Sequence, residues 1–200
     1  MRNTRLLLAL PALILAPIAA QAAEFTVKPG GDNKVVFISS ATMEKFEGKT
    51  NQLSGRIVVD PSAALGDSAS VHLEVDLASL DTGIAKRNQH MREEHLETSK
   101  YPKAIFDGTA LSHAPGVTLA TGQPVGFDAD GTFSLHGVSR RIHVHIDATY
   151  HAGADGGTIE FHTEFPVTLE DYKISRPEFL FMKLAEKQDV RVSGVASATP

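Results

Sequence analysis

Hydrophobic and polar residues alternate along most of the chain after residue 22, as they do in strands with one buried face. Residues 71–77 show this clearly, because four aliphatic residues alternate there with His72, Glu74 and Asp76. The same alternation predicts strands at residues 35–38, 55–61, 71–77, 103–107, 132–136, 141–147, 158–165 and 189–195. We therefore expect at least eight strands, each with one apolar face.

Residues that favour turns separate these strands. They occur at residues 29–32, 60–61, 114–116, 128–131 and 153–157, which are rich in Gly, Pro and Asp. Many amphipathic strands joined by tight turns indicate an antiparallel sandwich or barrel. A barrel has the advantage that closing the sheet removes its exposed edges.

Two segments depart from the alternation. Residues 81–98 are highly charged and place apolar residues at helical spacing, which predicts one or two short helices that cap a barrel mouth. Asp81 or Thr82 is the expected N-cap, and Tyr101-Pro102 is expected to end the helical stretch, because the residue before proline avoids the helical region. Residues 169–184 are interpreted as the entry to a strand followed by a hydrophobic turn.

The N-terminus has the features of a secretory signal peptide. Arg2 and Arg5 precede an apolar stretch, and small residues lead to an A-x-A site that ends at Ala22. The apolar stretch is interrupted by prolines and is shorter than the ~20 residues that cross a bilayer, so a membrane anchor is the less favoured interpretation. We predict cleavage after Ala22, export of the protein, and one domain over residues 23–200.

Composition excludes several classes of function. The chain has no cysteine, so disulfides, thiol catalysis and an acylated N-terminal cysteine are excluded. Loss of Arg2 and Arg5 moves the formal charge from −5 to −7. A mildly acidic domain without basic clusters is a poor candidate for binding nucleic acid or anionic membrane surfaces. No later stretch is long and apolar enough to predict stable membrane insertion.

Histidine and carboxylate residues raise a metal-site hypothesis. His143 and His145 share a face of one predicted strand, and His162 lies on the corresponding face of another, near Glu160 and Glu164. The alternative is that these histidines lie on the solvated outer face, opposite the apolar residues. The alternation favours this alternative, so no metal is predicted.

The sequence contains no recognisable catalytic constellation. It has no Gly-x-Ser-x-Gly elbow, Ser-x-x-Lys pair or phosphate-binding loop. His90 and His95 are five residues apart and would lie on different faces of a helix, unlike the pair in zinc proteases. We therefore predict a protein that is not an enzyme and needs no cofactor. A triad assembled from distant residues stays open as an alternative.

Four segments resemble the YceI-like family, and they follow one another in the order expected for that family. They are VVFISSATMEKFEG (35–48), LASLDTGIAKRNQHM (77–91), YPKAIF (101–106) and GTFSLHGVSR (131–140). One departure is Asn88 after Arg87, where many members have aspartate. The resemblance implies an extended eight-stranded antiparallel β-barrel, lipocalin-like and closed near one end by short helices. It also implies an elongated apolar cavity that takes a polyisoprenoid chain, and pairing as dimers in some members.

The resemblance directs attention to two groups of residues. Side chains expected to form the cavity wall are Phe37, Leu73, Val75, Phe106, Phe133, Leu135, Ile142, Val144 and Phe161. Arg87, His90 and Arg92 in the helical segment are expected to bind a lipid head group as charged donors. Their alternative role is structural, with Arg87 paired to a nearby acid. Alternation alone does not distinguish a cavity from a filled core, although about eight strands can enclose one small ligand.

The leading hypothesis is therefore a periplasmic or secreted carrier of an isoprenoid-type lipid, such as an isoprenoid quinone or a polyprenyl phosphate. Burial of the methyl-rich chain would drive binding. Two alternatives stay open. One is a stress-related interaction protein with a filled barrel, and the other is an enzyme that acts on a lipid head group.

Overall fold

The computed structural model describes residues 22–40, 45–65, 69–112, 118–176, 178–179 and 182–199. The predicted signal peptide, apart from Ala22, lies outside the described residues, and so does the predicted turn at residues 114–116. The first strand begins at Ala23, directly after the predicted cleavage position.

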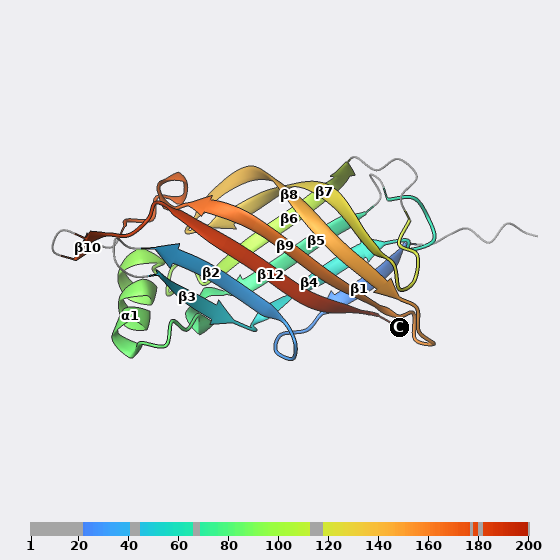
Figure 1. The fold of residues 1–200 in the computed structure, drawn as a ribbon, viewed down its shortest axis with the longest axis horizontal. Helices are drawn as coiled ribbons and strands as arrows, with labels where there is room; N and C mark the ends of the chain where they lie inside the picture. Colours follow the sequence, from blue (N-terminus) through green and yellow to red (C-terminus); the bar gives the residue numbers. More distant parts are fainter. Residues whose placement is uncertain are drawn as a thin grey trace, which may run out of the picture.

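Antiparallel strands make up most of the described chain (Figure 1). They are β1 (Ala23–Val27), β2 (Lys34–Ser40), β3 (Lys45–Thr50), β4 (Leu53–Val59), β5 (Ser70–Asp76), β6 (Lys103–Ser112), β7 (Pro124–Leu135), β8 (Val138–His151), β9 (Thr158–Thr168), β10 (Glu178–Phe179), β11 (Met182–Lys183) and β12 (Lys187–Ala198).

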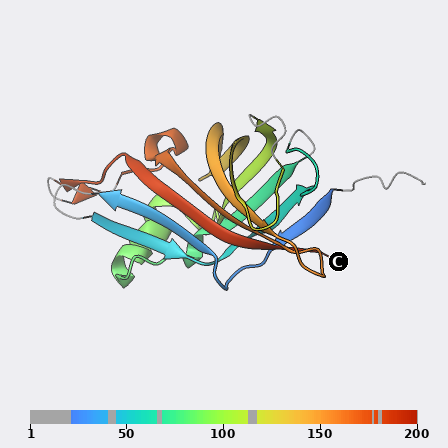
Figure 2. The ribbon, with the colours of Figure 1, turned by 45° about the vertical axis from the view of Figure 1, so that its right-hand side comes forward.

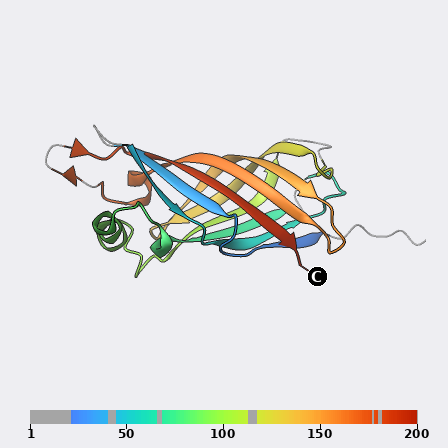
Figure 3. The same cartoon turned by 60° about the horizontal axis from the view of Figure 1, so that its bottom comes forward.

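Eight of these strands close into a barrel. The main sheet has the order β1-β4-β5-β6-β7-β8-β9-β12-β2-β3, and an additional pairing of β1 with β12 closes it, with Phe25 opposite Ala198. Strand β2 pairs with an earlier part of β12, where Val190 lies opposite Phe37, and β3 continues from β2. The turned views in Figure 2 and Figure 3 show the steeply tilted strands wrapping around a common interior. The predicted eight-stranded antiparallel barrel is thus confirmed.

Each of the eight predicted strands overlaps a strand of the structure, but the barrel does not use the same eight. Residues 35–38 belong to β2, one of the two strands that extend the sheet beyond the closed barrel. Strands β1 and β3 were not predicted. In β1, Ala23, Phe25 and Val27 do alternate with polar residues, but the strand is only five residues long, and β3 has Phe46 as its one large apolar residue. Short segments of this kind are weak evidence for a period of two.

The turn predicted at residues 128–131 is wrong, because these residues lie inside β7. Asp128 and Asp130 face outward, and Ala129 between them is fully buried. Gly131 leaves room for the ring of Phe106, since a Cβ there would lie 2.5 Å from its Cζ atom. The actual hairpin turn follows at His136-Gly137, where both residues have positive φ, as type I′ turns require.

Helical turns gather at one end of the barrel, as predicted (Figure 1). Helix α1 (Ala85–His90) continues into a turn of π-helix, η2 (Met91–His95), and short 3-10 turns lie at η1 (Leu77–Ser79) and η3 (Leu169–Tyr172).

Both predicted limits of the helical segment are wrong. The N-cap is Ile84, whose hydrocarbon side chain has no acceptor for an amide. Asp81 accepts from the amide of Gly83 and Thr82 accepts from Arg87, so both residues hold the preceding loop. The helical stretch ends at His95, and Glu97 adopts a left-handed conformation well before Pro102. None of the helices in the described ranges combines the length and hydropathy that a membrane span requires.

Asn88, the departure from the family pattern, has a structural explanation. Its side-chain oxygen accepts hydrogen bonds from the amide and hydroxyl of Thr82, at 2.8 and 2.7 Å. Its side-chain nitrogen donates to the carboxylate of Asp81 at 2.7 Å. An ionised aspartate has only acceptors and would face Asp81 with like charge. The amide therefore fits this loop because it donates and accepts at once.

Residues 169–184 partly match their prediction. The turn η3 is followed by the short β10–β11 hairpin, which lies beyond the helical end of the barrel (Figure 1). Residues 177, 180 and 181, within the predicted hydrophobic turn, lie outside the described residues.

The buried apolar residues form two clusters. The barrel cluster lies between the strands of the barrel and includes fully buried Phe25 and Ala129. The helix-end cluster closes the end covered by the helical segment, whose Met91 and Leu96 pack against it. The buried members of the helix-end cluster are Leu77, Leu80, Ala104, Phe133, Leu135, Val167, Leu169, Tyr172 and Ile174.

Candidate functional site

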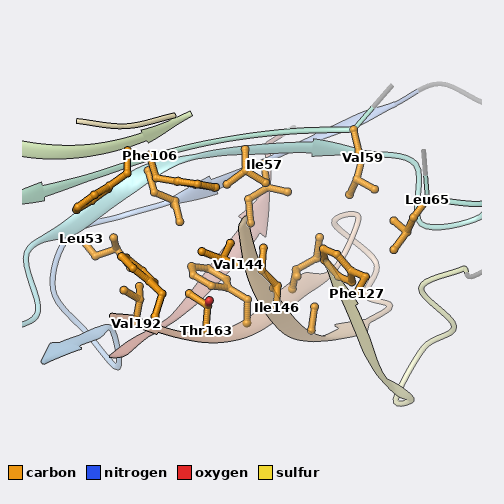
Figure 4. Close-up of a pocket in the computed structure, with 18 of the residues that line it drawn as sticks. Leu53, Ile57, Val59, Leu65, Phe106, Phe127, Val144, Ile146, Thr163 and Val192 are labelled. Carbon is orange, nitrogen blue, oxygen red and sulfur yellow. The ribbon is translucent and has the colours of Figure 1, made fainter. Parts of the chain in front are cut away.

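A cavity runs through the interior of the barrel (Figure 4). Its wall is built from inward-facing residues of β4, β5, β6, β7, β8, β9 and β12, joined by residues of two loops. Its volume is about 80 Å³, within about 900 Å³ of space free of protein atoms that includes the part open to solvent. The barrel interior therefore contains a small apolar cavity and is not completely filled by side chains.

The cavity wall is apolar along its whole length. Thr163 is the one polar residue among the lining side chains of the described chain, and its hydroxyl donates to the backbone oxygen of His145 at 2.7 Å. The hydroxyl hydrogen is therefore used within the protein, and only the acceptor capacity of this one oxygen is left for a polar group of a ligand. A molecule inside this cavity is held by burial of apolar surface.

The two ends of the cavity are built differently. Figure 4 shows Phe106, Leu53 and Val192 toward one end, and Val59 and Leu65 toward the other. The first end borders the helix-end cluster, against which Phe106 also packs. At the second end the lining passes from strands to loops, which contribute the buried residues Leu65 and Leu119.

Six of the nine predicted wall residues line this cavity. They are Leu73, Val75, Phe106, Phe133, Val144 and Phe161. Leu135 is instead buried in the helix-end cluster, and Phe37 and Ile142 pack against that cluster. All nine were chosen for their inward face, and inward residues beyond the end of the cavity pack in or against the helix-end cluster instead. Their role in ligand binding stays a prediction.

Sequence reasoning missed many wall residues that obey the same alternation. Ile57, Ile146 and Phe165 are examples, and extending each strand's inward set would have found them. Leu65 and Leu119 belong to loops, where no period marks the side chains that turn inward. Only the tertiary structure identifies them.

None of the three predicted head-group residues lines the cavity. Arg87 donates to the hydroxyl and the backbone oxygen of Thr82, at 3.0 and 2.9 Å, and its guanidinium lies 4.1 Å from the centre of the Phe46 ring. These contacts hold the start of α1 against β3, which is a structural role of the kind considered above.

Arg92 and His90 likewise contact their own segment. Arg92 donates from Nη2 to the backbone oxygen of Leu80 at 2.9 Å, and its Nε is buried without a hydrogen-bond partner in the described chain. His90 is exposed, 4.0 Å from Glu94. Head-group binding by these three residues stays a prediction, and the cavity itself does not bring them together.

Comparison with known protein families shows to which family the chain belongs. A model described as the YceI-like domain matches residues 25–196. The chain belongs to the YceI-like family. Among similar sequences are two UPF0312 proteins, both 27% identical to this YceI-like protein. The protein of Vibrio cholerae aligns over 150 residues, 74% of each chain, and that of Shewanella baltica over 171 residues, 80% of this chain and 84% of its own.

Solved structures share the fold of this YceI-like protein. A polyisoprenoid binding domain from Saccharophagus degradans superposes with a TM-score of 0.69 at 22% identity, covering 90% of this chain and all of that domain. BcnA of Burkholderia cenocepacia superposes with a TM-score of 0.65 at 20% identity, covering 82% of this chain and 96% of its own. At these identities the likeness establishes the barrel architecture.

The histidines of the metal hypothesis lie on the outer face of the YceI-like barrel. His145 contacts Asp128 at 2.8 Å, and His143 contacts Asp130 at 3.0 Å, each across the β7–β8 pair. His162 lies against Ser193 of β12 instead, at 3.0 Å. Among the described residues, no three His, Asp or Glu side chains form a group that could hold a metal ion.

The outer face also makes the stability of this YceI-like protein depend on pH. A hydrogen bond from His72 to Asp107, at 2.6 Å, raises the pKa of His72 above its ordinary value of 6.5, and Glu74 adds to the effect against partial burial. A raised pKa in the folded state stabilises the fold fully below the unfolded pKa. This contribution is lost as pH rises through the folded pKa.

We therefore expect His72→Gln to lose more stability at about pH 5.5 than at about pH 8.5. The difference should be about 1 kcal/mol or less, because solvent screens a side chain that is 34% exposed. Urea unfolding of both proteins at the two pH values measures it. His162→Gln, which removes a ring that faces a hydroxyl, serves as the control, and an equal loss at both pH values would contradict the assignment.

Proposed function

We propose that this protein is exported and carries an isoprenoid-type lipid, such as an isoprenoid quinone or a polyprenyl phosphate, with the lipid chain inside the barrel. The observation that carries the proposal is the cavity wall, which is apolar throughout and whose single hydroxyl is already bonded. Such a wall suits a long hydrocarbon without internal polar groups, since every polar group placed inside would lose its water partners.

Two further observations support a lipid. The solved relative from Saccharophagus degradans is described as a polyisoprenoid binding domain, and it shares the barrel. A methyl-branched chain also has a large apolar surface, and burial of that surface contributes about 25 cal/mol per Å². A charged head group would be placed outside the apolar wall, because burying an unpaired charge there is far more costly.

The alternatives are less well supported. A barrel that acts only through its outer surface needs no internal cavity, yet an apolar cavity lies inside this one. An enzyme acting on the lipid would need a proton donor or nucleophile near it. Among the described residues, the histidines whose pKa is raised are His72 and His145, and both lie on the outer face. Pairing of two copies, which the resemblance implies for some members, stays a prediction.

Mass spectrometry of the native protein tests the proposal. The full-length chain is expressed in its own host, the protein is purified from the exported fraction, and bound material is extracted with organic solvent. We expect an isoprenoid in the extract and a mature N-terminus at Ala23. An extract without lipid, together with no uptake of added isoprenoid, would refute lipid carriage, and a protein that keeps residues 1–22 inside the cell would refute export.

A further inference from the structure

Two phenylalanine rings mark the end of the cavity beside the helical segment. Phe133 of β7 and Phe165 of β9 both line the cavity, and their ring centres lie 5.4 Å apart at an interplanar angle of 75°. Phe133 also contacts the ring of Tyr172 edge-on, with centres 5.5 Å apart. Tyr172 is buried and does not line the cavity. The ring pair therefore faces the cavity on one side and packed protein on the other.

The protein behind the ring pair is a closed apolar layer. Leu135, Val167 and Leu169 are each at most 8% exposed, and all belong to the helix-end cluster together with Phe133. Close-packed side chains of this kind leave no room for a ligand chain unless they move. We call Phe133 and Phe165 the cavity floor, because both rings line the cavity and both pack in or against the helix-end cluster.

A floor of this kind has a particular consequence for a chain made of repeating units. Each additional methylene buried in the cavity strengthens binding about fourfold, the equivalent of about 0.8 kcal/mol. This gain stops when the chain reaches the floor, because further units must stay in water or force packed side chains apart. Isoprenoid lipids of one class differ chiefly in the number of repeating units, so the position of the floor selects among them.

We propose that Phe133 and Phe165 determine the longest isoprenoid chain that the cavity accepts. The inference rests on the proposed function and adds to it a length limit and the residues that set this limit. The limit is a property of the side chains at the floor, so single substitutions there should move it without altering the apolar character of the wall.

The floor offers substitutions in both directions. Phe133→Leu and Phe165→Leu remove ring atoms and deepen the cavity toward the helix-end cluster. Ala104 of β6 also lines the cavity and belongs to the helix-end cluster. Ala104→Leu adds three carbons at this end and shortens the space available. A general loss of stability would not shift the length limit in opposite directions in Ala104→Leu and in the phenylalanine variants.

The test measures the affinity of delipidated protein for linear isoprenoid alcohols that differ by one isoprene unit. For the wild type we expect affinity to rise with each unit up to a limit and then stop rising. Phe133→Leu and Phe165→Leu should move this limit up by at least one unit, and Ala104→Leu should move it down. Phe127→Leu is the matched control, since Phe127 lies near the other end of the cavity (Figure 4), and it should weaken all lengths to a similar extent with an unchanged limit.

Three results would contradict the proposal that Phe133 and Phe165 set the length limit. They are an unchanged limit in the floor variants, shifts of the same sign for Ala104→Leu and the phenylalanine variants, and an equal shift in Phe127→Leu, which would assign the limit to total volume. A wild type that binds no alcohol of any length would count against lipid carriage itself. Thermal melting of each variant is recorded first. If one phenylalanine variant does not fold, the test is made with the other phenylalanine variant and Ala104→Leu.

Discussion

Replacing Ala148 with tryptophan should abolish lipid uptake and leave the barrel folded. Ala148 lies on β8, is 4% exposed and lines the cavity, so a larger side chain there extends into space that a ligand would occupy. Every 100 Å² of lipid surface kept out of the cavity costs about 2.5 kcal/mol, roughly a 70-fold loss of affinity. Titration with an isoprenoid alcohol and mass spectrometry of the organic extract both measure the loss.

The neighbouring residue provides the control for this experiment. Thr149 precedes Tyr150 on the same strand, does not line the cavity and lies opposite Glu160 on the outer face. Thr149→Trp adds a ring of equal size outside the barrel and should bind lipid as the wild type does. If Ala148→Trp takes up lipid normally, the lipid binds elsewhere and the proposed use of the cavity is wrong.

Phe25→Ala should produce the largest loss of stability. Phe25 is fully buried in β1, the strand that closes the barrel by pairing with both β4 and β12, and its ring packs edge-on against Tyr150 at 6.1 Å. Removing a fully buried phenylalanine ring costs about 3–5 kcal/mol, because transfer energy is lost and a void remains. Urea unfolding followed by circular dichroism measures the change.

A phenylalanine that lines the cavity provides the comparison. Phe127 also faces inward, but it lines the cavity and is only partly buried, so fewer contacts disappear when its ring is removed. Phe127→Ala should therefore lose clearly less stability than Phe25→Ala. Equal losses would indicate that β1 is not packed as the structure has it, or that the cavity is filled in solution.

Much of the candidate site could be predicted from the alternation of residues. Val144, for example, was assigned to the interior because the residues on both sides of it are histidines, and it lines the cavity. Leu135 satisfied the same criterion but lies in the helix-end cluster. Alternation assigns a side chain to a face of the sheet, whereas its height along the barrel depends on strand tilt and register. The height of a residue along the barrel decides whether it lines the cavity, as Val144 does, or packs in the helix-end cluster, as Leu135 does.

The arginines show a different limit of sequence reasoning. Arg87 was a reasonable candidate for an anionic head group by its charge, but Thr82 and Phe46 already surround its guanidinium. Thr82 is only five residues before Arg87, but Phe46 belongs to β3 and lies 41 residues before it. No local pattern reveals a contact with so distant a ring, and only the folded chain shows it.

The amino-acid sequence by itself determined which face of each long strand is buried, because side chains of a strand point alternately to opposite sides. The family motifs added the barrel and its helical end. Only the tertiary structure decided that β1 closes the barrel while β2 and β3 extend it, because β1 and β2 both pair along one edge of β12 and neither shows this in its own residues. It also decided that the interior holds an apolar cavity with Phe133 and Phe165 in its lining, since free volume depends on how all the strands tilt around it.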